Sequence, residues 1–423
     1  MDATALRKLV EREALAAGTA APHLTDETVS AALGEVSALA RERRPEILAA
    51  NAADCEAAAG RLDEGALDRL RLDEARLGAL ADQAAAMAEL EPLDREEVAW
   101  TLPNGLRVSG RRIPIGVVGA NFEARPNVAL DVAGQLLKSL NAAVLRTGGA
   151  ALRTVTVLVD DVLRPALDRA GVPPGAVGLV RSPDREGARV LVSLPDAIPL
   201  VILRGSGPTT AELARFAAEH GVRTIAHAEG GGVLYVHASA STKSALEIAE
   251  ASLDRLGVCN RLNLALVDRG AVGVLPELLA VFDRLALEVR GTDRAAAHAA
   301  SLLPLDRPLG HEWAGEADRV ATVTVDVVDD LDEAVRIANE QTSGLAAAIV
   351  AEDEPSARRF LDGYRGTAAF WNAPTRFTDG FELTGAPETG INVDRAPGPR
   401  GPVTYRDLWL RQYRIVGDGT QRR

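Results

Sequence analysis

The sequence predicts an α/β protein, with a parallel sheet that has helices on both faces and a second, smaller α/β unit after it. From about residue 113 onward, short apolar runs alternate with helical segments, which is the pattern of a parallel sheet. The alternation starts again after Cys259, so a second, smaller α/β unit is expected there. At 423 residues, the chain can bury at least two cores.

The composition excludes several classes of protein. Hydrophobic residues make up 47% and charged residues 25%, as in an ordinary globular protein, and the net charge of −13 gives no basic surface for nucleic acid or an anionic membrane. No apolar run could span a bilayer, and the N-terminus has no signal-peptide core, so we expect a cytoplasmic protein. Cys55 and Cys259 cannot form a disulfide framework and lack zinc-ligand spacing, so no metal is expected.

The first 96 residues are expected to be helical, because alanine-rich stretches carry charges at helical spacing. Thr25 is a suitable N-cap. Cys55 lies on this stretch among alanines, where the role of a small apolar filler is expected. The segment EVAWTLPNGLRVSGRRI then alternates around Asn104-Gly105, which predicts a β-hairpin.

The remaining strands are expected in apolar runs separated by helices. In the first unit the runs are IPIGVVGA, AAVLRT, AVGLV, IPLVILR, VRTIAHA and VLYVHA. In the second unit they are LNLALV, VATVTVDVV, AAAIVAE and AAFWNA, with helices at DDLDEAVRIANEQ and EPSARRFLDGY. The tail APGPRGPVTYRDLWLRQYRIVGDG ends in a strand with no partner nearby in the sequence, so pairing with a neighbouring subunit is expected.

Cys259 is the first candidate for chemistry. It stands between a Gly-Val step and Asn260, at the junction where the alternation restarts and where a cleft can form. A thiolate presented on an accessible loop would be a nucleophile, whereas a buried cysteine would be structural. The residues alone leave both interpretations open.

Two further segments could bind anions. RGSGPTT, at 204–210, follows a predicted strand and precedes a helix, so its backbone could approach a phosphate. An ordinary strand-to-helix turn explains the same letters. The segment 122–149 places charged and polar residues at strand ends, where arginine and lysine suit phosphates and carboxylates, although each of them alone could be a surface residue. They are Glu123, Arg125, Asn127, Lys138 and Arg146.

Together these segments resemble the γ-glutamyl phosphate reductase (glutamate-5-semialdehyde dehydrogenase) family of the aldehyde dehydrogenase superfamily. The most specific motifs are IPIGVVGANFEARPNVALDVAGQLLKSLNAAVLR, LGVCNRLNLALV, NAPTRFTDGFELTGAPETGIN and PGPRGPVTY. The resemblance implies an aldehyde-dehydrogenase-like fold. Its parts would be a Rossmann-type NADP-binding domain at 1–96 and 113–254, a smaller α/β catalytic domain at 255–390, and an oligomerisation hairpin and tail at 97–112 and 391–423.

The resemblance also implies a reaction. Cys259 matches the nucleophile of the family's V-C-N motif and would attack an acyl phosphate, by default L-glutamyl 5-phosphate, to give a thioester. Hydride from NADPH would then give a thiohemiacetal that collapses to glutamate-5-semialdehyde, a step of proline biosynthesis. The backbone N–H of Cys259 would help to hold the oxyanion. His227 stands where hydrolytic relatives carry a glutamate, and a packing role for it is equally open.

The site residues implied by the resemblance fall into three sets. The catalytic set is Cys259, Asn260, Asn127 and His227. The set for NADP(H) is Lys138, Arg146, Gly205, Ser206, Gly207 and Glu316. The set for the substrate is Glu123, Arg125, Thr375, Arg376 and Glu388.

The expected partners are a small acyl phosphate and further copies of the chain, in a dimer or tetramer, without nucleic acid or membrane. Whether an upstream kinase hands over the acyl phosphate stays open, as does the preference for NADP over NAD.

Three departures from the family pattern leave the substrate open. Leu140 replaces the glycine of K-S-G-N, Leu345 replaces the histidine of S-G-H-S-D, and HAEGGGV replaces H-L-D-G-x-C-H. The first interpretation is therefore the reductase, and the second is a paralogue that acts on a different activated acyl group. A third is a non-catalytic binding paralogue, against which the retention of Cys259 and Asn260 speaks.

Overall fold

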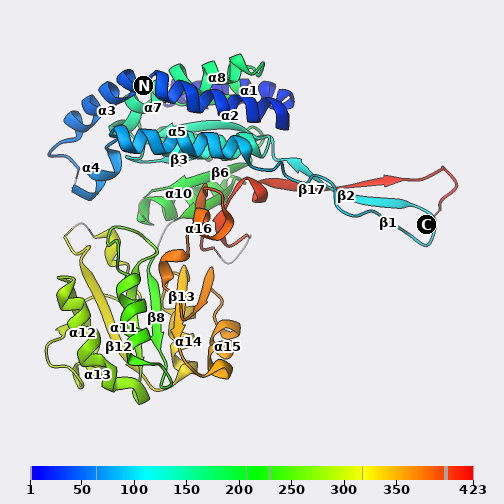
Figure 1. Cartoon of the computed structure of the whole chain (residues 1–423). Coiled ribbons are helices and arrows are strands. Elements are labelled where there is room, and N and C mark those ends of the chain that lie inside the picture. Colours follow the sequence, from blue (N-terminus) through cyan, green and yellow to red (C-terminus); the bar gives the residue numbers. More distant parts are fainter. Residues whose placement is uncertain are drawn as a thin grey trace. The chain divides into compact units, whose positions relative to one another are not determined.

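The protein is described by a computed structural model that covers residues 2–62, 64–205, 207–227, 230–316, 318–394 and 399–422, without the side chains of Glu64 and His227. The chain folds into two compact units (Figure 1). The first unit comprises Met1–Ala226, Ala386–Gly390 and Val403–Arg423; the second comprises His227–Gly385 and Ile391–Pro402.

A five-stranded sheet in the order β5-β4-β3-β6-β7 forms the centre of the first unit. Strands β3, β4, β5 and β6 run parallel, as expected from the alternation. The chain leaves β3 toward β4 and β5 and later returns on the other side as β6, so the strand order reverses between β3 and β6. In an open α/β sheet, ligands bind at the carboxyl ends of the strands beside such a reversal. The strands are β3 (Val117–Phe122), β4 (Ala142–Thr147), β5 (Val177–Leu179), β6 (Leu200–Arg204) and β7 (Arg223–His227).

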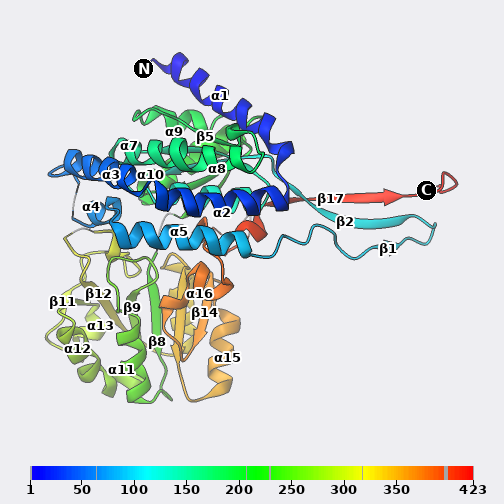
Figure 2. The same ribbon diagram turned by 45° about the horizontal axis from the view of Figure 1, so that its top comes forward.

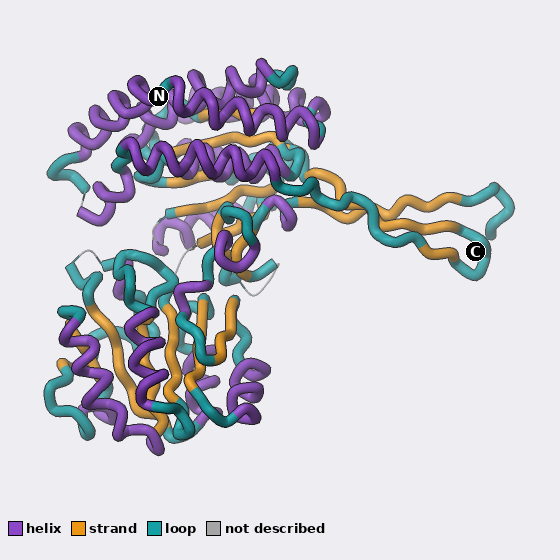
Figure 3. The backbone as a smooth tube through the Cα atoms, viewed as in Figure 1, coloured by secondary structure: helices purple, strands orange, loops and turns teal. Residues whose placement is uncertain are grey.

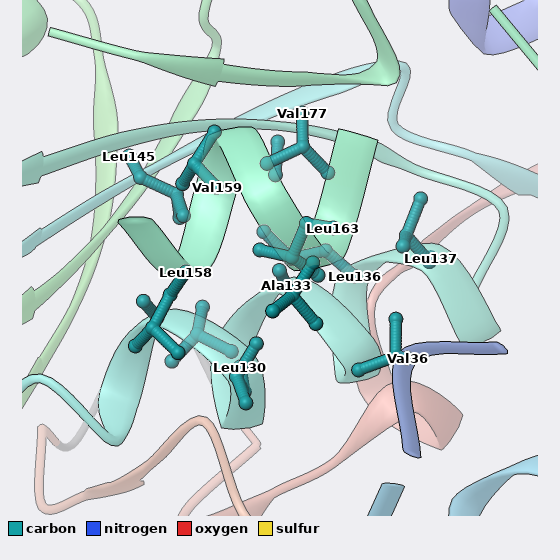
Figure 4. Packing of buried hydrophobic residues seen from close by; sticks show 14 of the residues in the cluster. Val36, Leu130, Ala133, Leu136, Leu137, Leu145, Leu158, Val159, Leu163 and Val177 are labelled. Atoms are coloured by element: carbon teal, nitrogen blue, oxygen red, sulfur yellow. The ribbon is translucent and has the colours of Figure 1, made fainter. Parts of the chain in front are cut away.

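Helices cover both faces of this sheet, because alternate strand residues point to opposite sides. Val118, Ala120 and Phe122 of β3 join one buried cluster, whereas Val117 joins the other. Figure 4 shows part of the first cluster, to which leucines of α6 and Leu145 of β4 both belong. Helices on that face are α2 (Asp26–Glu42), α3 (Arg44–Ala58), α4 (Glu64–Leu70), α5 (Glu74–Glu89), α6 (Val128–Lys138), α7 (Leu152–Val157) and α8 (Arg164–Arg169). Those on the other face are α1 (Ala3–Ala20), α9 (Glu186–Leu191) and α10 (Gly207–Glu219).

The helical N-terminal segment confirms two predictions. Thr25 is the N-cap of α2, and its hydroxyl accepts the N–H of Thr28 in a capping box. Helix α2 lies beside α5, and both views show the pair (Figures 1 and 2). Cys55 lies in α3, half-buried against the core, where burial raises the pKa of its thiol. The packing role expected for Cys55 therefore holds.

A three-stranded antiparallel ribbon, β1-β2-β17, belongs to the first unit (Figure 3). The predicted hairpin is confirmed by the pairing of β1 (Trp100–Thr101) with β2 (Arg107–Pro114). The tail strand β17 (Trp409–Val416) pairs with β2 over its whole length. The expectation that this strand needs a neighbouring subunit as its partner was wrong, because the edge of β2 not paired with β1 is available within the same chain.

The second unit contains a seven-stranded sheet in the order β11-β10-β12-β9-β8-β13-β14, in which all pairs are parallel. Its strands are β8 (Gly232–Val236), β9 (Leu262–Asp268), β10 (Glu288–Gly291), β11 (Leu303–Pro304), β12 (Thr322–Val328), β13 (Ala346–Val350) and β14 (Ala368–Trp371). Its helices are α11 (Thr242–Ala251), α12 (Leu275–Arg284), α13 (Asp293–Ala296), α14 (Leu331–Glu340), α15 (Glu354–Gly363) and α16 (Gly380–Thr384).

The boundary between the units differs from the expected one. The sequence placed 113–254 in the cofactor domain, but β8 and α11 belong to the second unit, because β8 pairs with β9 and β13. Two strands were also missed: β10 reads EVRG and β11 has two residues, so neither shows the apolar run of a buried strand. Short strands β15 (Gly390–Asn392) and β16 (Gly401–Val403) pair with each other.

None of the helices described is long and apolar enough to cross a membrane. No group of three or more histidine, cysteine, aspartate or glutamate residues among the described residues is placed to hold a metal ion.

Leu140 occupies a position that favours glycine. It follows the C-cap of α6 with φ = 60°, in the left-handed region. The N–H of Asn141 donates to the carbonyl of Leu136 and the N–H of Leu140 to that of Leu137, which is the Schellman pattern of helix ends. The departure at Leu140 is therefore a matter of helix termination, and it lies at the end of α6 away from the strands' carboxyl ends.

We expect Leu140→Gly to unfold at a higher temperature than Leu140→Ala. Alanine removes side-chain contacts and keeps the left-handed backbone, whereas glycine also relieves a conformational cost of about 1 kcal/mol. The difference should appear as about 2 °C in the thermal unfolding midpoint. A glycine variant no more stable than the alanine variant would contradict the assignment of strain to this residue.

Candidate active site

Cys259 lies in the turn before β9, in the second unit. Its side chain is partly exposed and packs against a small apolar cluster formed by Leu345, Ala346 and Ile391. The turn is tied to the start of β8: the N–H of Gly231 donates to the carbonyl of Cys259 at 2.6 Å, and the N–H of Gly232 to that of Arg261 at 2.7 Å. Cys259 is thus held on fixed backbone within reach of a small molecule.

Gly230 packs directly beside this turn. A Cβ atom added to Gly230 would lie 2.5 Å from the Cβ of Cys259 and 2.5 Å from Oε1 of Glu312, closer than real side chains approach. The N–H of Gly230 donates to Oε2 of Glu312 at 2.9 Å. The Cβ of Cys259 and Oε1 of Glu312 thus each lie 2.5 Å from the point that a side chain of residue 230 would occupy. The two groups can be this close to each other because residue 230 is a glycine.

Asn260 holds the loop of residues 375–378 against the cysteine turn. Its buried side-chain amide donates to the carbonyls of Arg376 at 2.9 Å and Thr378 at 3.1 Å. Its side-chain oxygen accepts a hydrogen bond from the Arg376 guanidinium. All of these bonds are internal to the protein, and the catalytic role of Asn260 stays a prediction.

The two predicted substrate residues of this loop are also engaged within the protein. Thr375 is fully buried, and its hydroxyl donates to the Asn260 carbonyl at 2.8 Å. Arg376 pairs through Nε with Asp254 at 2.5 Å as well as with Asn260. The structure brings both residues beside Cys259, while a role in binding substrate stays a prediction.

Arg261 is a buried cation at the base of this turn. Nη2 donates to the carbonyl of Thr322 at 2.7 Å, while Nε and Nη1 have no hydrogen-bond partner among the described atoms. Burial lowers the pKa of Arg261 to about 10, and the negative charge of Glu312 opposes this shift. Arg261 is therefore a buried cation two residues after Cys259 in the sequence.

Glu316, predicted to approach the cofactor ribose, belongs to an ionic cluster of the second unit. Nε of Arg307 donates to its carboxylate at 3.2 Å, and Nε2 of His311 lies 2.7 Å away. Burial alone would raise the pKa of Glu316, but these two partners outweigh it and hold the pKa below its ordinary value. Glu316 therefore remains an anion, and its partly exposed side chain leaves the ribose role as a prediction.

The other predicted residues lie in the first unit. Gly205 directly follows β6, and a Cβ added there would lie 3.3 Å from Oγ1 of Thr210 in α10, so the loop is tightly packed. Gly207 begins α10. Ser206 lies outside the described residues, as does the side chain of His227, whose backbone ends β7. Gly205 and Gly207 therefore lie at the N-terminus of α10, where an anion could bind.

Lys138 is a correction to the cofactor set. It ends α6, so it lies at the end of the helix opposite to Asn127. Its fully buried ammonium group donates to Oγ of Ser30 at 3.2 Å and to the carbonyl of Ala88 at 3.3 Å. Burial lowers the pKa of Lys138. The lysine joins helices of the first unit and does not reach the carboxyl ends of the strands.

Arg146 lies near the carboxyl end of β4 but points into the protein. Its buried guanidinium donates to Oδ1 of Asn121 at 3.1 Å and to the carbonyl of Asp184 at 2.9 Å. Burial lowers the pKa of Arg146, and Glu123 and Asp184 oppose this shift. Contact with a cofactor phosphate would require these bonds to rearrange, and that role stays a prediction.

Polar residues gather where β3 and β6 end. Phe122 of β3 pairs with Arg204 of β6, and Glu123, Arg125 and Asn127 follow β3 directly. Two members of this group, Asp131 and Arg204, were not predicted as site residues from the sequence. The spacing of four residues from Asn127 to Asp131 on a predicted helix could have indicated the first. All members are partly exposed: Glu123, Arg125, Asn127, Asp131, Arg204 and Glu388.

Comparison with known proteins agrees with these features. Residues 30–281 and 321–404 match the aldehyde dehydrogenase family. The γ-glutamyl phosphate reductase of Thermobifida fusca is 35% identical over 98% of both chains, and that of Clavibacter michiganensis is 39% identical over 98% of this chain and 95% of the relative.

Solved structures give the same result for the fold. The crystal structure of γ-glutamyl phosphate reductase from Thermotoga maritima superposes with a TM-score of 0.90 at 27% identity, covering 98% of this chain and all of the other. An engineered glycolyl-CoA reductase with bound NADP⁺ is 14% identical with a TM-score of 0.69, over 96% of both chains, and shares the fold alone.

These matches span nearly the whole chain and include both units. They confirm the expected fold and oxidoreductase class. The chain belongs to the aldehyde dehydrogenase family, on its γ-glutamyl phosphate reductase branch.

Proposed function

We propose that the protein reduces an acyl phosphate, L-glutamyl 5-phosphate, to glutamate-5-semialdehyde with NADPH, as in proline biosynthesis. The observation that carries this proposal is the fixed, partly exposed Cys259 in a chain whose near full-length relatives are named γ-glutamyl phosphate reductase. A cysteine anchored by its own backbone carbonyl can attack a carbonyl carbon without reorganising the loop.

Cys259 would carry the covalent step. Its thiolate sulfur forms a bond to the acyl carbon, the bond from that carbon to the phosphate oxygen breaks, and phosphate leaves with the electron pair. After hydride addition, the oxyanion re-forms the carbonyl and expels the Cys259 thiolate, which releases the aldehyde. The backbone N–H of Cys259 would stabilise the oxyanion, and Asn260 would keep the turn in place for both steps.

The first unit offers residues that fit a nicotinamide cofactor. Gly205 follows β6 where a Cβ would lie only 3.3 Å from Oγ1 of Thr210, and α10, with 13 residues, begins at Gly207. We propose that Gly205, Ser206 and Gly207 hold the cofactor's phosphates and that Glu316 contacts its ribose. When bound, the cofactor supplies the hydride for the reduction.

One observation favours a second candidate function. Leu345 is fully buried in the apolar cluster on which Cys259 packs, where the family pattern has a histidine. An apolar wall beside the nucleophile suits an activated acyl group other than glutamyl phosphate. The second candidate is therefore a reductase of the same mechanism with a different acyl donor.

The reverse reaction tests both candidates, because the acyl phosphate itself is unstable. Purified protein with glutamate-5-semialdehyde, phosphate and NADP⁺ should form reduced cofactor, followed by absorbance. Cys259→Ala should lower turnover by about a thousandfold or more, because the covalent step is lost, and should change NADPH affinity less than about twofold.

Cys55→Ala is the matched control, because Cys55 lies in α3 and should leave turnover unchanged. Unchanged turnover in the Cys259 variant would overturn the covalent mechanism. NADPH binding without phosphate-dependent turnover by the wild type would favour the second candidate.

We also propose that the ribbon of β1, β2 and β17 joins copies of the chain. Its β17 strand has one edge paired with β2, and four of its apolar side chains are exposed: Leu410, Tyr413, Ile415 and Val416. An exposed strand with apolar side chains is a template for association, and a second copy of the chain is the simplest occupant.

The substitutions Tyr413→Glu and Ile415→Glu together, on the face of β17 opposite to Gln412, should shift the protein to a smaller species in light scattering, because they place charges in the apolar contact. Gln412→Glu, on the same exposed strand, should leave the mass unchanged. If the double variant keeps the wild-type mass, the ribbon does not join copies of the chain.

A further inference from the structure

Glu312 is a charged residue that the proposed mechanism does not use. It belongs to the second unit, and its side chain is partly exposed. Its Oε2 accepts the N–H of Gly230 at 2.9 Å. A hydrogen bond to a carboxylate is roughly twice as strong as one between neutral groups, so Glu312 holds the backbone of Gly230 firmly.

The residue that Glu312 holds packs against the nucleophile. Gly230 is buried, and a Cβ atom added to it would lie 2.5 Å from the Cβ of Cys259 and 2.6 Å from the carbonyl oxygen of Cys259. The next residue, Gly231, donates its N–H to this same carbonyl at 2.6 Å. A movement of the backbone at Gly230 would therefore be transmitted to Cys259.

Asn263 fixes the backbone on both sides of Glu312. It is a buried residue of β9, four positions after Cys259. Its Nδ2 donates to the carbonyl of His311 at 2.5 Å, and its Oδ1 accepts the N–H of Trp313 at 3.0 Å. One side-chain amide thus ties the segment that carries Glu312 to the strand that follows the nucleophile.

The indole ring of Trp313 adds a second anchor for this segment. The ring is fully buried, and its Nε1 donates to Oγ1 of Thr324 on β12 at 2.8 Å. Since β12 pairs with β9, both anchors belong to the same part of the sheet. The side chain of Glu312 therefore starts from a rigid base, and its carboxylate connects that base to the glycine beside the nucleophile.

We propose that Glu312 is a positioning residue for Cys259 and acts through the N–H of Gly230. The inference rests on the proposed function, in which the Cys259 sulfur attacks a carbonyl carbon. A displacement of about 1 Å between reacting atoms can cost about a hundredfold in rate. The role requires a hydrogen-bond acceptor of the right length, so glutamine should be able to replace Glu312 and alanine should not.

Hydrogen exchange of the full-length protein tests the contact without any substrate. Mass spectrometry follows the peptide that contains the amides of Gly230 and Gly231. Glu312→Ala removes the acceptor and should raise the exchange rate of these amides about tenfold or more, the size expected for a hydrogen bond to a charged group. Glu312→Gln keeps an acceptor and should raise the rate less than about threefold. Equal exchange in the wild type and the alanine variant would overturn the proposal.

The reverse assay with glutamate-5-semialdehyde, phosphate and NADP⁺ measures the consequence for catalysis. Glu312→Ala should lower kcat about tenfold or more and change KM less than about threefold, because the sulfur is misplaced and the ligand sites are not. Glu312→Gln should keep kcat within about threefold of the wild type. Glu312→Asp, whose carboxylate is one methylene too short, should lose kcat like the alanine variant and replaces it if alanine prevents folding.

Glu277→Ala is the matched control, because Glu277 is an exposed glutamate on α12 of the same unit and should change neither readout. A loss of kcat in the glutamine variant as large as in the alanine variant would show that the charge itself is needed. That result would contradict a role that depends on the hydrogen bond.

Asn263→Ala gives a second variant that leaves Glu312 in place. It releases the segment on both sides of Glu312, so it should lower kcat and speed exchange at Gly230 in the same way. Since the two residues would act through one series of contacts, the double variant should lose at most about threefold beyond the worse single variant. Losses that multiply would show independent effects and contradict the proposed series.

The two readouts separate this inference from the proposed function. Faster exchange in Glu312→Ala, together with a wild type that does not turn over glutamate-5-semialdehyde, would overturn the proposed reaction and support the hold of Glu312 on Gly230. Faster exchange together with unchanged kcat in the alanine variant would overturn the positioning role and keep the reaction.

Discussion

The buried amide of Asn260 is the interaction on which the cysteine turn depends. Both of its donors and its acceptor are used within the protein, by the 375–378 loop on one side of Cys259. A buried amide left unpaired would cost about 1–3 kcal/mol, so turn and loop keep one another in place. A polar network therefore fixes the residues around Cys259, and a small apolar cluster packs against its side chain.

Two glycines allow other groups of the second unit to lie close to the Cys259 turn. Gly230 admits the carboxylate of Glu312 because it has no Cβ. A Cβ added to Gly232 would lie 2.6 Å from Oγ1 of Thr375, so this glycine lets the 375–378 loop pack against the start of β8. These distances are too short for any side chain, so no other residue could replace Gly230 or Gly232 unless the backbone moved. The stretch that leads into β8, with Gly230 and Gly232, therefore shapes the site of the second unit.

Much of the fold could be predicted from the sequence, because apolar runs such as LNLALV and IPLVILR are typical of buried parallel strands. The edge strands β10 and β11 could not, since EVRG has no such run. The boundary at His227 was missed because β8 looks the same in either sheet; only its pairing with β9 decides. The candidate site was predicted less completely. Lys138 was assigned to the cofactor site because the motif does not show which end of α6 lies at the carboxyl ends of the strands. Asp131 and Arg204 were missed because they belong to different elements, α6 and β6, whose ends only the tertiary structure brings together.

The last residues of the chain complete the core of the first unit. The N–H of Tyr405 donates to Oε1 of Gln135, and the side chain of Asn141 donates to the carbonyl of Leu408, across 270 and 267 positions of the sequence. The second unit, apart from a short return, is an insertion that is synthesised before these residues. On the ribosome, the inserted unit can therefore finish folding before its host receives its final segment, so the order of maturation runs from the middle of the chain outward.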